Sequence, residues 1–187
     1  DTARTALKKM GDTGNPWGLP GDDRIQWARG LDVPFAADRK DFEYLWWVGC
    51  AGAYDPRNQK VTRTIASLLS RAGVNYATLG LEETCCGESM RKVGDEELFR
   101  TLMDNNVEQF ASRGVEKIVV LSPHCFHAFK TDYAELGAKL DSWGDLATYA
   151  VLPMSVWWLW PELIRQEVVF VTVVVVSYVV PTVVGFL

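Results

Sequence analysis

The stretch EYLWWVGCAGAYDPRNQKVTRTIASLLSRAG, residues 43–73, decides the fold class of this 187-residue chain. Its first part, residues 43–49, is aromatic and apolar, as is typical of a β-strand. Asp55 and Pro56 then predict the start of a helix, because aspartate caps a helix well and proline fits the first helical turn. Gly73 is a typical helix end. The stretch therefore predicts a strand followed by a helix.

The apolar side chains of this helix recur at helical spacing and comprise Val61, Ile65, Leu68, Leu69 and Ala72. The alternation of strands and helices continues along the chain. Strands are predicted at residues 75–79 and 116–121, a helix at 94–114 and a helical segment at 125–133. The apolar face of the second helix is predicted to comprise Phe99, Met103, Val107 and Phe110. Alternating strands and helices predict an α/β fold, in which a parallel sheet with right-handed crossovers is flanked by helices.

The chain has four cysteines, and each follows a predicted strand: Cys50, Cys85, Cys86 and Cys125. The carboxyl ends of parallel strands meet at one edge of a sheet, where open α/β sheets bind their ligands. Gly87 directly follows the adjacent pair, and its permissive backbone allows both sulfurs to turn toward one point. The four cysteines are therefore predicted to converge on a single metal site.

Several kinds of site remain open on the residues alone. Free cysteines are often buried as small apolar side chains, and two of the four could form a disulfide. Four thiolates could also hold zinc, although structural zinc sites usually use short Cys-x-x-Cys motifs, which this chain lacks. Soft thiolates at wide spacing suit an iron–sulfur cluster best, and this interpretation is favoured.

Three segments carry a resemblance to a known family: WVGCAGAY at 47–54, TCCGES at 84–89 and SPHCFHAF at 122–129. They resemble the cysteine-rich CCG domain of heterodisulfide reductase catalytic subunits, of glycolate and lactate oxidase iron–sulfur subunits, and of related membrane oxidoreductases. The leader NPWGLPGDDRIQWARGLDVP, residues 15–34, is similar to the segment before the first such domain in larger iron–sulfur proteins that accept electrons from flavoproteins. The resemblance covers residues 13–137.

One position departs from the family pattern. The last family element usually reads Cys-Pro-His-Cys, whereas Ser122 stands here in place of its first cysteine. Five cysteines in the family support unusual clusters that cleave disulfides, so four thiolates are better suited to one ordinary [4Fe–4S] cluster. Ser122 remains a candidate weak oxygen ligand, and His124 a candidate hydrogen-bond donor to a cluster sulfur. His127 is interpreted as structural.

The resemblance implies an electron-relay subunit of a membrane-bound oxidoreductase rather than a catalytic one. Its implied partners are a flavoprotein or ferredoxin-like donor and a quinone- or haem-binding membrane subunit. A thiol–disulfide reductase of the heterodisulfide type is one alternative. A structural anchor subunit, stabilised by zinc or free of metal, is another.

The composition sets the domain organisation. A net charge of −5 without a cluster of Lys or Arg argues against a nucleic-acid partner. The chain begins with Asp1 rather than Met, so we expect a processed product or a fragment of something longer. The predicted parts are an irregular leader at 1–40 docked by Trp17 and Trp27, the CCG-type domain at 41–138, a linker or junction at 139–155, and a membrane-spanning segment at 156–187.

The C-terminal segment has the features of a transmembrane helix. The 20 residues from 168 to 187 carry no charge, enough at ~1.5 Å each to cross ~30 Å of hydrocarbon. Trp157, Trp158 and Trp160 precede them, as an interfacial aromatic belt would. Because reduced cysteines and a missing export signal indicate the cytoplasm, we expect the iron–sulfur domain on the cytoplasmic side of the cell inner membrane.

Overall fold

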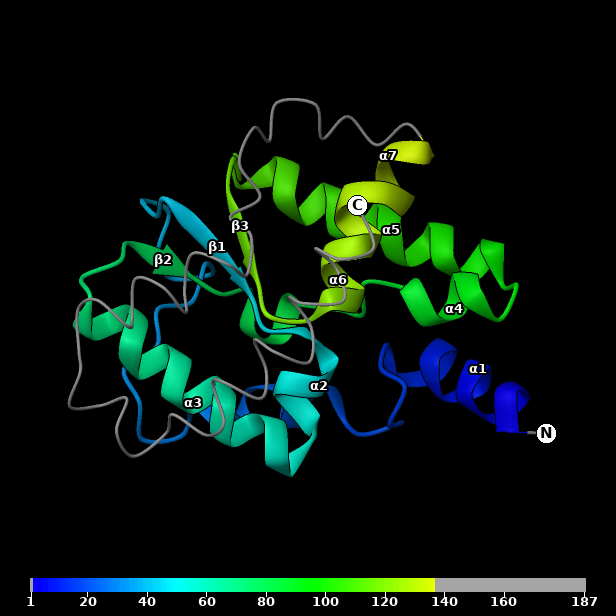
Figure 1. The fold of residues 1–187 in the computed structure, drawn as a ribbon, viewed down its shortest axis with the longest axis horizontal. Coiled ribbons are helices and arrows are strands. Elements are labelled where there is room, and N and C mark those ends of the chain that lie inside the picture. Colours follow the sequence, from blue (N-terminus) through cyan, green and yellow to red (C-terminus); the bar gives the residue numbers. More distant parts are fainter. Residues whose placement is uncertain (1, 137–187) are drawn as a thin grey trace, which may run out of the picture. The chain divides into compact units, whose positions relative to one another are not determined.

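The computed structural model describes residues 2–136, and Figure 1 shows their arrangement. The helical elements are α1 (Thr2–Thr13), the 3-10 helix η1 (Gly21–Ala28), α2 (Gly49–Tyr54), α3 (Pro56–Arg71), the 3-10 helix η2 (Gly80–Glu82), α4 (Glu88–Lys92), α5 (Glu96–Ser112), α6 (Pro123–His127), the π-helix η3 (Ala128–Asp132) and α7 (Tyr133–Glu135). The strands are β1 (Tyr44–Trp47), β2 (Tyr76–Ala77) and β3 (Ile118–Val120). The predicted transmembrane helix lies outside the described residues. Within residues 2–136, every helix is too short or too polar to span a bilayer.

The three strands form a parallel sheet in the order β2-β1-β3, which confirms the predicted α/β class. In β1, Tyr44 pairs with Tyr76 of β2, and Leu45 pairs with both Ala77 of β2 and Ile118 of β3. After the central strand β1, the chain forms β2 beside one edge of β1 and later forms β3 beside the other edge. Such a reversal opens a crevice at the carboxyl end of the central strand, the usual place for a ligand in an open α/β sheet.

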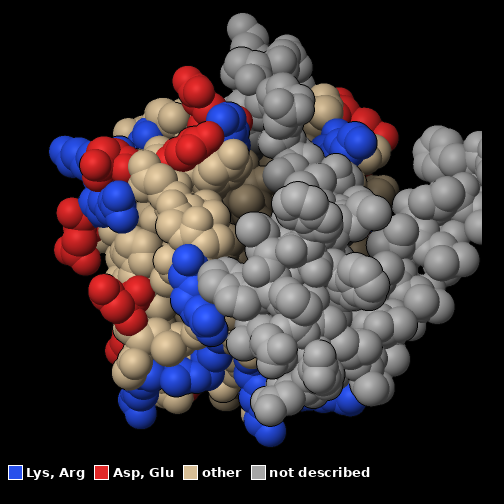
Figure 2. Space-filling view, turned by 60° about the vertical axis from the view of Figure 1, so that its left-hand side comes forward, with Lys and Arg blue, Asp and Glu red and all other residues tan. Residues whose placement is uncertain are grey.

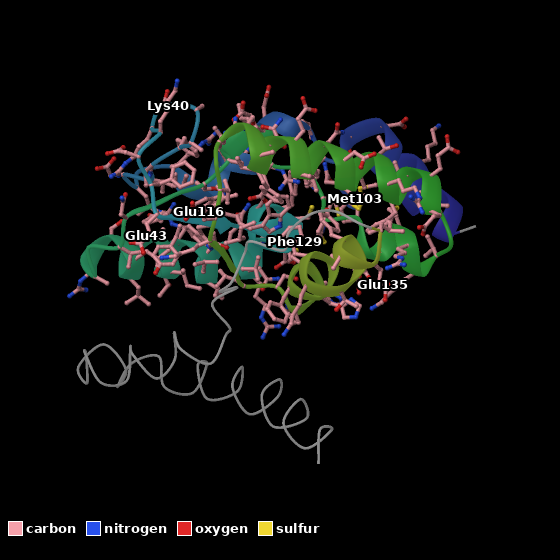
Figure 3. The ribbon with its side chains drawn as sticks, turned by 90° about the horizontal axis from the view of Figure 1, so that it is seen from above. Lys40, Glu43, Met103, Glu116, Phe129 and Glu135 are labelled. Atoms are coloured by element: carbon pink, nitrogen blue, oxygen red, sulfur yellow. The ribbon has the colours of Figure 1, made fainter. Side chains whose placement is uncertain are left out.

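Both faces of the sheet are covered, and α3 and α5 lie on opposite sides of the strands (Figure 1). Successive side chains of a strand point to opposite faces, and the two tryptophans of β1 follow this rule. Trp46 packs edge-on against Trp27, with ring centroids 5.4 Å apart. Trp47 packs against Phe110 at 5.7 Å and against Phe129 at 5.0 Å. Figure 3 shows Phe129 in the interior of the fold, near α5.

The local signals for α3 are confirmed at its start and end. The Asp55 carboxylate accepts hydrogen bonds from the backbone N–H groups of the next turn, and Gly73 follows the helix at φ +66°. Leu69 is buried as predicted, but the other buried positions are Thr62 and Ala66, whereas the predicted Val61, Ile65 and Leu68 are half-buried and Ala72 is exposed. The Thr62 hydroxyl donates to the backbone carbonyl of Gly52, and a Cβ at Gly52 would lie 2.8 Å from that hydroxyl. This close approach of α2 turns α3 by about one residue.

The predicted apolar face of α5 is largely correct. Phe99, Met103 and Phe110 are buried, whereas Val107 is only half-buried. Asp95 caps the helix by accepting from the Leu98 backbone N–H at 3.0 Å. The second predicted helix therefore forms where its charge and apolar pattern place it.

The leader contains α1 and η1, although its turn-rich composition predicted irregular structure. Trp27 is buried against the sheet, as expected of a docking residue. Trp17 stacks on Tyr54 with ring centroids 6.2 Å apart and stays 38% exposed. The leader is thus held by aromatic contacts at two positions.

The visible charges are mixed. On the face drawn in Figure 2, Asp and Glu side chains border the uncharged centre together with Lys and Arg side chains. In Figure 3, Lys40 projects outward at the edge of the fold.

Candidate functional site

The four cysteines lie at the carboxyl edge of the sheet, each on a segment that follows a strand. Cys50 is in the first turn of α2 after β1, Cys85 and Cys86 are in the loop between η2 and α4, and Cys125 is in α6 after β3. All four are buried and none forms a disulfide. Neighbouring thiols perturb the pKa values of Cys50, Cys85 and Cys86, and Cys125 is one of the neighbours that act on Cys86. The structure therefore brings the four predicted residues together in one cysteine row.

Two glycines make room for this row. Gly87 is left-handed at φ +83°, and its backbone N–H donates to the Cys85 sulfur at 3.4 Å. A Cβ there would lie 2.7 Å from the ring of Phe99, so only glycine fits. Gly49 is also left-handed, at φ +75°, and a Cβ on it would lie 3.4 Å from the Cys125 sulfur. The turn after the adjacent cysteines is thus formed as the sequence predicted.

A buried ion pair lies against the first cysteine. Nη2 of Arg24 donates to the Cys50 sulfur at 3.3 Å, and Nη1 of Arg24 donates to the Glu83 carboxylate at 2.8 Å. The same carboxylate accepts the backbone N–H groups of Val48 at 2.9 Å and Gly49 at 2.8 Å. Glu83 therefore fixes the backbone that leads from β1 into the Cys50 turn.

The sequence interpretation missed this pair. Arg24 belongs to the leader and Glu83 to the loop before Cys85, and 59 residues separate them. One signal was available: a carboxylate two residues before adjacent cysteines that are predicted to be buried needs a cation or several N–H donors.

The charges of this pair respond to burial and to each other. Burial opposes the charge on Arg24, but the Cys50 thiol and the Glu83 carboxylate outweigh it, so the pKa of Arg24 is raised above its usual range. Burial raises the pKa of Glu83, and the guanidinium of Arg24 offsets part of that effect. Arg24 is therefore a permanent buried cation beside a cysteine.

The thiols differ in acidity along the row. Hydrogen bonds from Cys50, and then from Cys86, hold the pKa of Cys85 well below its usual range. The pKa of Cys50 is raised, because it donates to Cys85 and is buried. The pKa of Cys86 is raised by its hydrogen bonds to Cys125 and Cys85 and by burial. Since the thiolate is the form that binds metals, the lowered pKa of Cys85 favours ligation at this position.

The backbone of the adjacent cysteines is held by two side chains that the sequence interpretation also missed. The Asn106 amide donates to the backbone carbonyl of Cys85 at 2.9 Å and to the Tyr133 hydroxyl at 3.0 Å. The Tyr133 hydroxyl donates in turn to the backbone carbonyl of Cys86 at 3.0 Å. Asn106 lies within an otherwise apolar helix face, and a fully buried amide at such a place indicates a backbone partner.

The two histidines lie outside the row. His124 is 68% exposed, and its Nδ1 pairs with the Glu88 carboxylate at 3.0 Å instead of a cysteine sulfur. The hydrogen bond from His124 to a cluster sulfur stays a prediction. His127 lies 3.5 Å from Asp132 on the surface. Ser122 precedes α6 as its N-cap residue and makes no side-chain capping bond.

An unpartnered donor supports the fit of a sulfur-rich group. The indole N–H of Trp47 is buried and has no hydrogen-bond partner among the described residues. The Cβ position of Gly49 is 3.8 Å from this nitrogen and 3.4 Å from the Cys125 sulfur, so the free donor borders the cysteine row. Buried donors normally have a partner, and thiolate or sulfide sulfur would provide one.

The row has the donor set of a cluster. Within residues 2–136, no three or more His, Cys, Asp and Glu side chains are grouped so as to hold a metal ion. An iron–sulfur cluster spreads its cysteine ligands over several iron atoms, so its thiolates need not meet at one point. Four soft sulfurs, a neighbouring cation and a free N–H donor fit such a group by their chemistry.

A cavity of about 430 Å³ lies elsewhere. Its lining includes Arg39, Lys40, Glu82 and Arg113 and contains none of the four cysteines. Arg39 is bonded to Asp41 and Asn75, and Arg113 to Glu82, so these cations already have partners. The cysteine row remains the candidate site.

Comparison with known families agrees with this site. Residues 44–130 match the model of the CCG family, described as a cysteine-rich domain. This part of the chain is a CCG cysteine-rich domain. The match includes all four cysteines, Glu83, Asn106 and Trp47, and it leaves Arg24 outside.

Three relatives show where such domains occur. The chain is 39% identical over 142 residues to a probable iron-sulfur-binding oxidoreductase FadF of Bacillus subtilis, covering 72% of this chain and 20% of the relative. It is 38% identical over 144 residues to an EtfAB:quinone oxidoreductase of Syntrophomonas wolfei, covering 74% and 20%. It is 32% identical over 136 residues to one subunit of the dihydromethanophenazine:CoB–CoM heterodisulfide reductase of Methanosarcina barkeri, covering 71% and 32%. No solved structure matches the chain.

The chain spans about a fifth of the length of the first two relatives. The first relative is named an iron-sulfur-binding oxidoreductase, and the other two are named an oxidoreductase and a reductase subunit.

Proposed function

We propose that this chain is an iron–sulfur electron-transfer subunit, or part of one, in a membrane-bound oxidoreductase complex. The observation that carries the proposal is the set of four buried thiols on the segments that follow the strands, at the carboxyl edge of the sheet. In this role Cys50, Cys85, Cys86 and Cys125 hold one [4Fe–4S] cluster. When bound, that cluster supplies one-electron redox chemistry.

The surrounding residues fit this role. Hydrogen bonds from Cys50 and Cys86 hold the pKa of Cys85 below its usual range, which favours the thiolate that a metal needs. Asn106 and Tyr133 hold the carbonyls of the adjacent cysteines, which keeps both sulfurs on one side of the loop. Trp47 offers a free N–H to sulfur. Burial of all four thiols keeps water away from the site.

The partners of this relay follow from the family resemblance and from the relatives' names. We propose a flavoprotein or ferredoxin-like donor and a quinone- or haem-binding membrane subunit as acceptor. The name of the Syntrophomonas relative, EtfAB:quinone oxidoreductase, supports a quinone at the end of such a path.

Metal analysis tests the proposal. After anaerobic purification the chain is expected to carry iron and sulfide at about four of each per molecule, with an EPR signal on reduction. Stoichiometric zinc, or a folded chain without any metal, would favour the alternative of a structural anchor subunit and overturn the electron-transfer proposal.

A second candidate is a thiol–disulfide reductase, which the similarity to a heterodisulfide reductase subunit favours. Ser122 stands where the family has a fifth cysteine, and this favours the relay over the reductase. The two functions separate in one assay, the reduction of a mixed disulfide by a chemically reduced viologen dye. The relay function predicts no thiol release above a Cys85→Ala control.

We further propose that residues 156–187 anchor the chain in the cell inner membrane, with the cysteine domain on the cytoplasmic side. An apolar segment of this length is unfavourable in water, at roughly 25 cal/mol per Å² of exposed apolar surface. Deleting residues 156–187 should release an iron-loaded domain from the membrane fraction. If the truncated chain stayed with membranes, the anchor would have to belong to another part of the complex.

A further inference from the structure

Arg24 is a buried cation that reaches the cysteine row from outside the CCG domain. It lies in η1 of the leader, and its side chain is 5% exposed. One arm of its guanidinium donates to Glu83 and the other donates to the Cys50 sulfur at 3.3 Å. The leader thus contributes a charged group to a site whose thiols all come from the CCG domain.

The Glu83 carboxylate does not need both arms of this arginine. It already accepts the backbone N–H groups of Val48 and Gly49, and one arm of Arg24 completes its hydrogen bonds. The second arm is left for sulfur. A buried ion pair by itself gives little net stability, because desolvation offsets the attraction between the charges. Placement of the cation on a thiol therefore indicates an electrostatic role at that thiol.

We infer that Arg24 is a positioning residue of the redox site, one that lowers the cost of adding negative charge beside Cys50. This inference rests on the proposed function. When the site accepts one electron from its donor, its net charge falls by one and no bond or proton needs to move. A fixed cation 3.3 Å from a ligand sulfur stabilises the more negative, reduced state and raises the midpoint potential.

Redox titration of the full iron-loaded chain, followed by EPR, tests this inference. Arg24→Gln removes the cation, so the midpoint potential should become more negative. The double variant Arg24→Gln with Glu83→Gln removes both charges and should shift in the same direction by less, because loss of the carboxylate offsets part of the loss of the cation that contacts Cys50. Arg24→Lys keeps the charge but lacks the planar fork that serves sulfur and carboxylate together, so its potential should lie between those of wild type and Arg24→Gln.

Arg63 offers a matched control in the same contact region. Its guanidinium donates to the backbone carbonyls of Trp27 and Arg29, so it holds the leader without touching a cysteine. Arg63→Gln should loosen the leader and leave the midpoint potential unchanged. Hydrogen exchange of the Trp27 region would report that loosening independently of the cluster.

Each outcome separates the inference from the function on which it rests. An Arg24→Gln chain with full iron content and the wild-type potential would overturn the inference and leave the electron-transfer proposal intact. An equal shift in Arg63→Gln would assign the effect to leader docking and overturn it as well. If both neutral variants lost iron while Arg24→Lys kept iron and the wild-type potential, Arg24 would serve assembly only, against the inference. A wild-type chain without iron would overturn both proposals.

Discussion

The two ends of the cysteine row have different surroundings. At the Cys50 end, which we call the closed end, Arg24 and Glu83 form an ion pair with side chains 5% and 1% exposed. At the Cys125 end, which we call the open end, the Glu88 carboxylate is paired with Lys92 and His124, whose side chains are 64% and 68% exposed. Both ends carry a cation–carboxylate pair, but only the closed end buries its cation, since Arg24 is 5% exposed and Lys92 is 64% exposed.

The difference shows which charges can influence the site. Charges interact several times more strongly inside a protein than in water, so the buried cation acts on its cysteine almost unscreened. The exposed histidine of the open end is surrounded by solvent and salt. We therefore expect the closed end to control the electronic properties of the site, and the open end to tolerate change.

The largest effect is expected from the loss of any one of the four cysteines, at either end of the row. Replacing any of Cys50, Cys85, Cys86 or Cys125 with Ala should abolish iron binding, because the cluster needs every thiolate. Each loss should also destabilise the domain, since metal binding is coupled to folding. Visible absorbance and iron analysis of the four variants measure this. Full iron content in Cys86→Ala would remove the adjacent pair from the site and disprove a shared cluster.

The next largest difference is expected in unfolding free energy, between two variants that each lose the carboxylate at one end of the row. Glu83→Ala leaves the buried Arg24 without a counter-charge and two backbone N–H groups without an acceptor, which should cost about 3–5 kcal/mol of unfolding free energy. Glu88→Ala breaks contacts with Lys92 and His124, whose side chains are largely exposed, and should cost much less. Urea unfolding of the metal-free, reduced chain compares the two. Similar losses for both would mean that the closed end is no more sensitive than the open one.

Substitutions at position 122 test whether the open end of the row can supply a further ligand to the cluster. Ser122 is half-buried at the start of α6, three residues before Cys125. Ser122→Cys restores the fifth cysteine of the family pattern, so it should raise the iron content per chain or change the EPR spectrum toward an unusual cluster. Ser122→Ala is the matched control and should change neither. An unaltered spectrum in Ser122→Cys would place this side chain away from the cluster.

The smallest expected effect is at His124. Its ring faces Glu88 and solvent, so His124→Gln should leave the iron content unchanged and the midpoint potential within experimental error. The same measurement on Arg24→Gln supplies the reference shift from the closed end. A shift in His124→Gln as large as that in Arg24→Gln would show that exposure does not distinguish the two ends.

Much of the fold could be predicted from local signals. Asp55 and Gly73 mark the bounds of α3, and the acidic start and apolar spacing of Glu96–Ser112 mark α5. The exact face that a helix buries could not be predicted from local signals. For α3 this face is decided by the close contact between Thr62 and Gly52. The spacing of apolar residues shows that a helix has an apolar face. Contacts with a neighbouring helix decide which of its side chains are buried.

The candidate site divides in the same way. Four cysteines, each following a strand, were sufficient to predict that the thiols meet, because parallel strands bring their carboxyl ends to one edge. Arg24, Asn106 and Tyr133 carried no motif, since their roles depend on partners that lie 21 to 47 residues away along the chain. Their contacts exist only once the leader, α5 and α7 have packed around the loop.

The sequence by itself determined the α/β class, the order of strands and helices, and the edge of the sheet at which the cysteines gather. These follow from short-range physics: strand and helix periodicity, capping side chains, and the fixed direction of parallel strands. Only the tertiary structure decided that Arg24 reaches Cys50 and that Glu83 links this cation to the β1 turn. A buried charge must find its counter-charge wherever the folded chain provides one, and sequence distance does not say where that is.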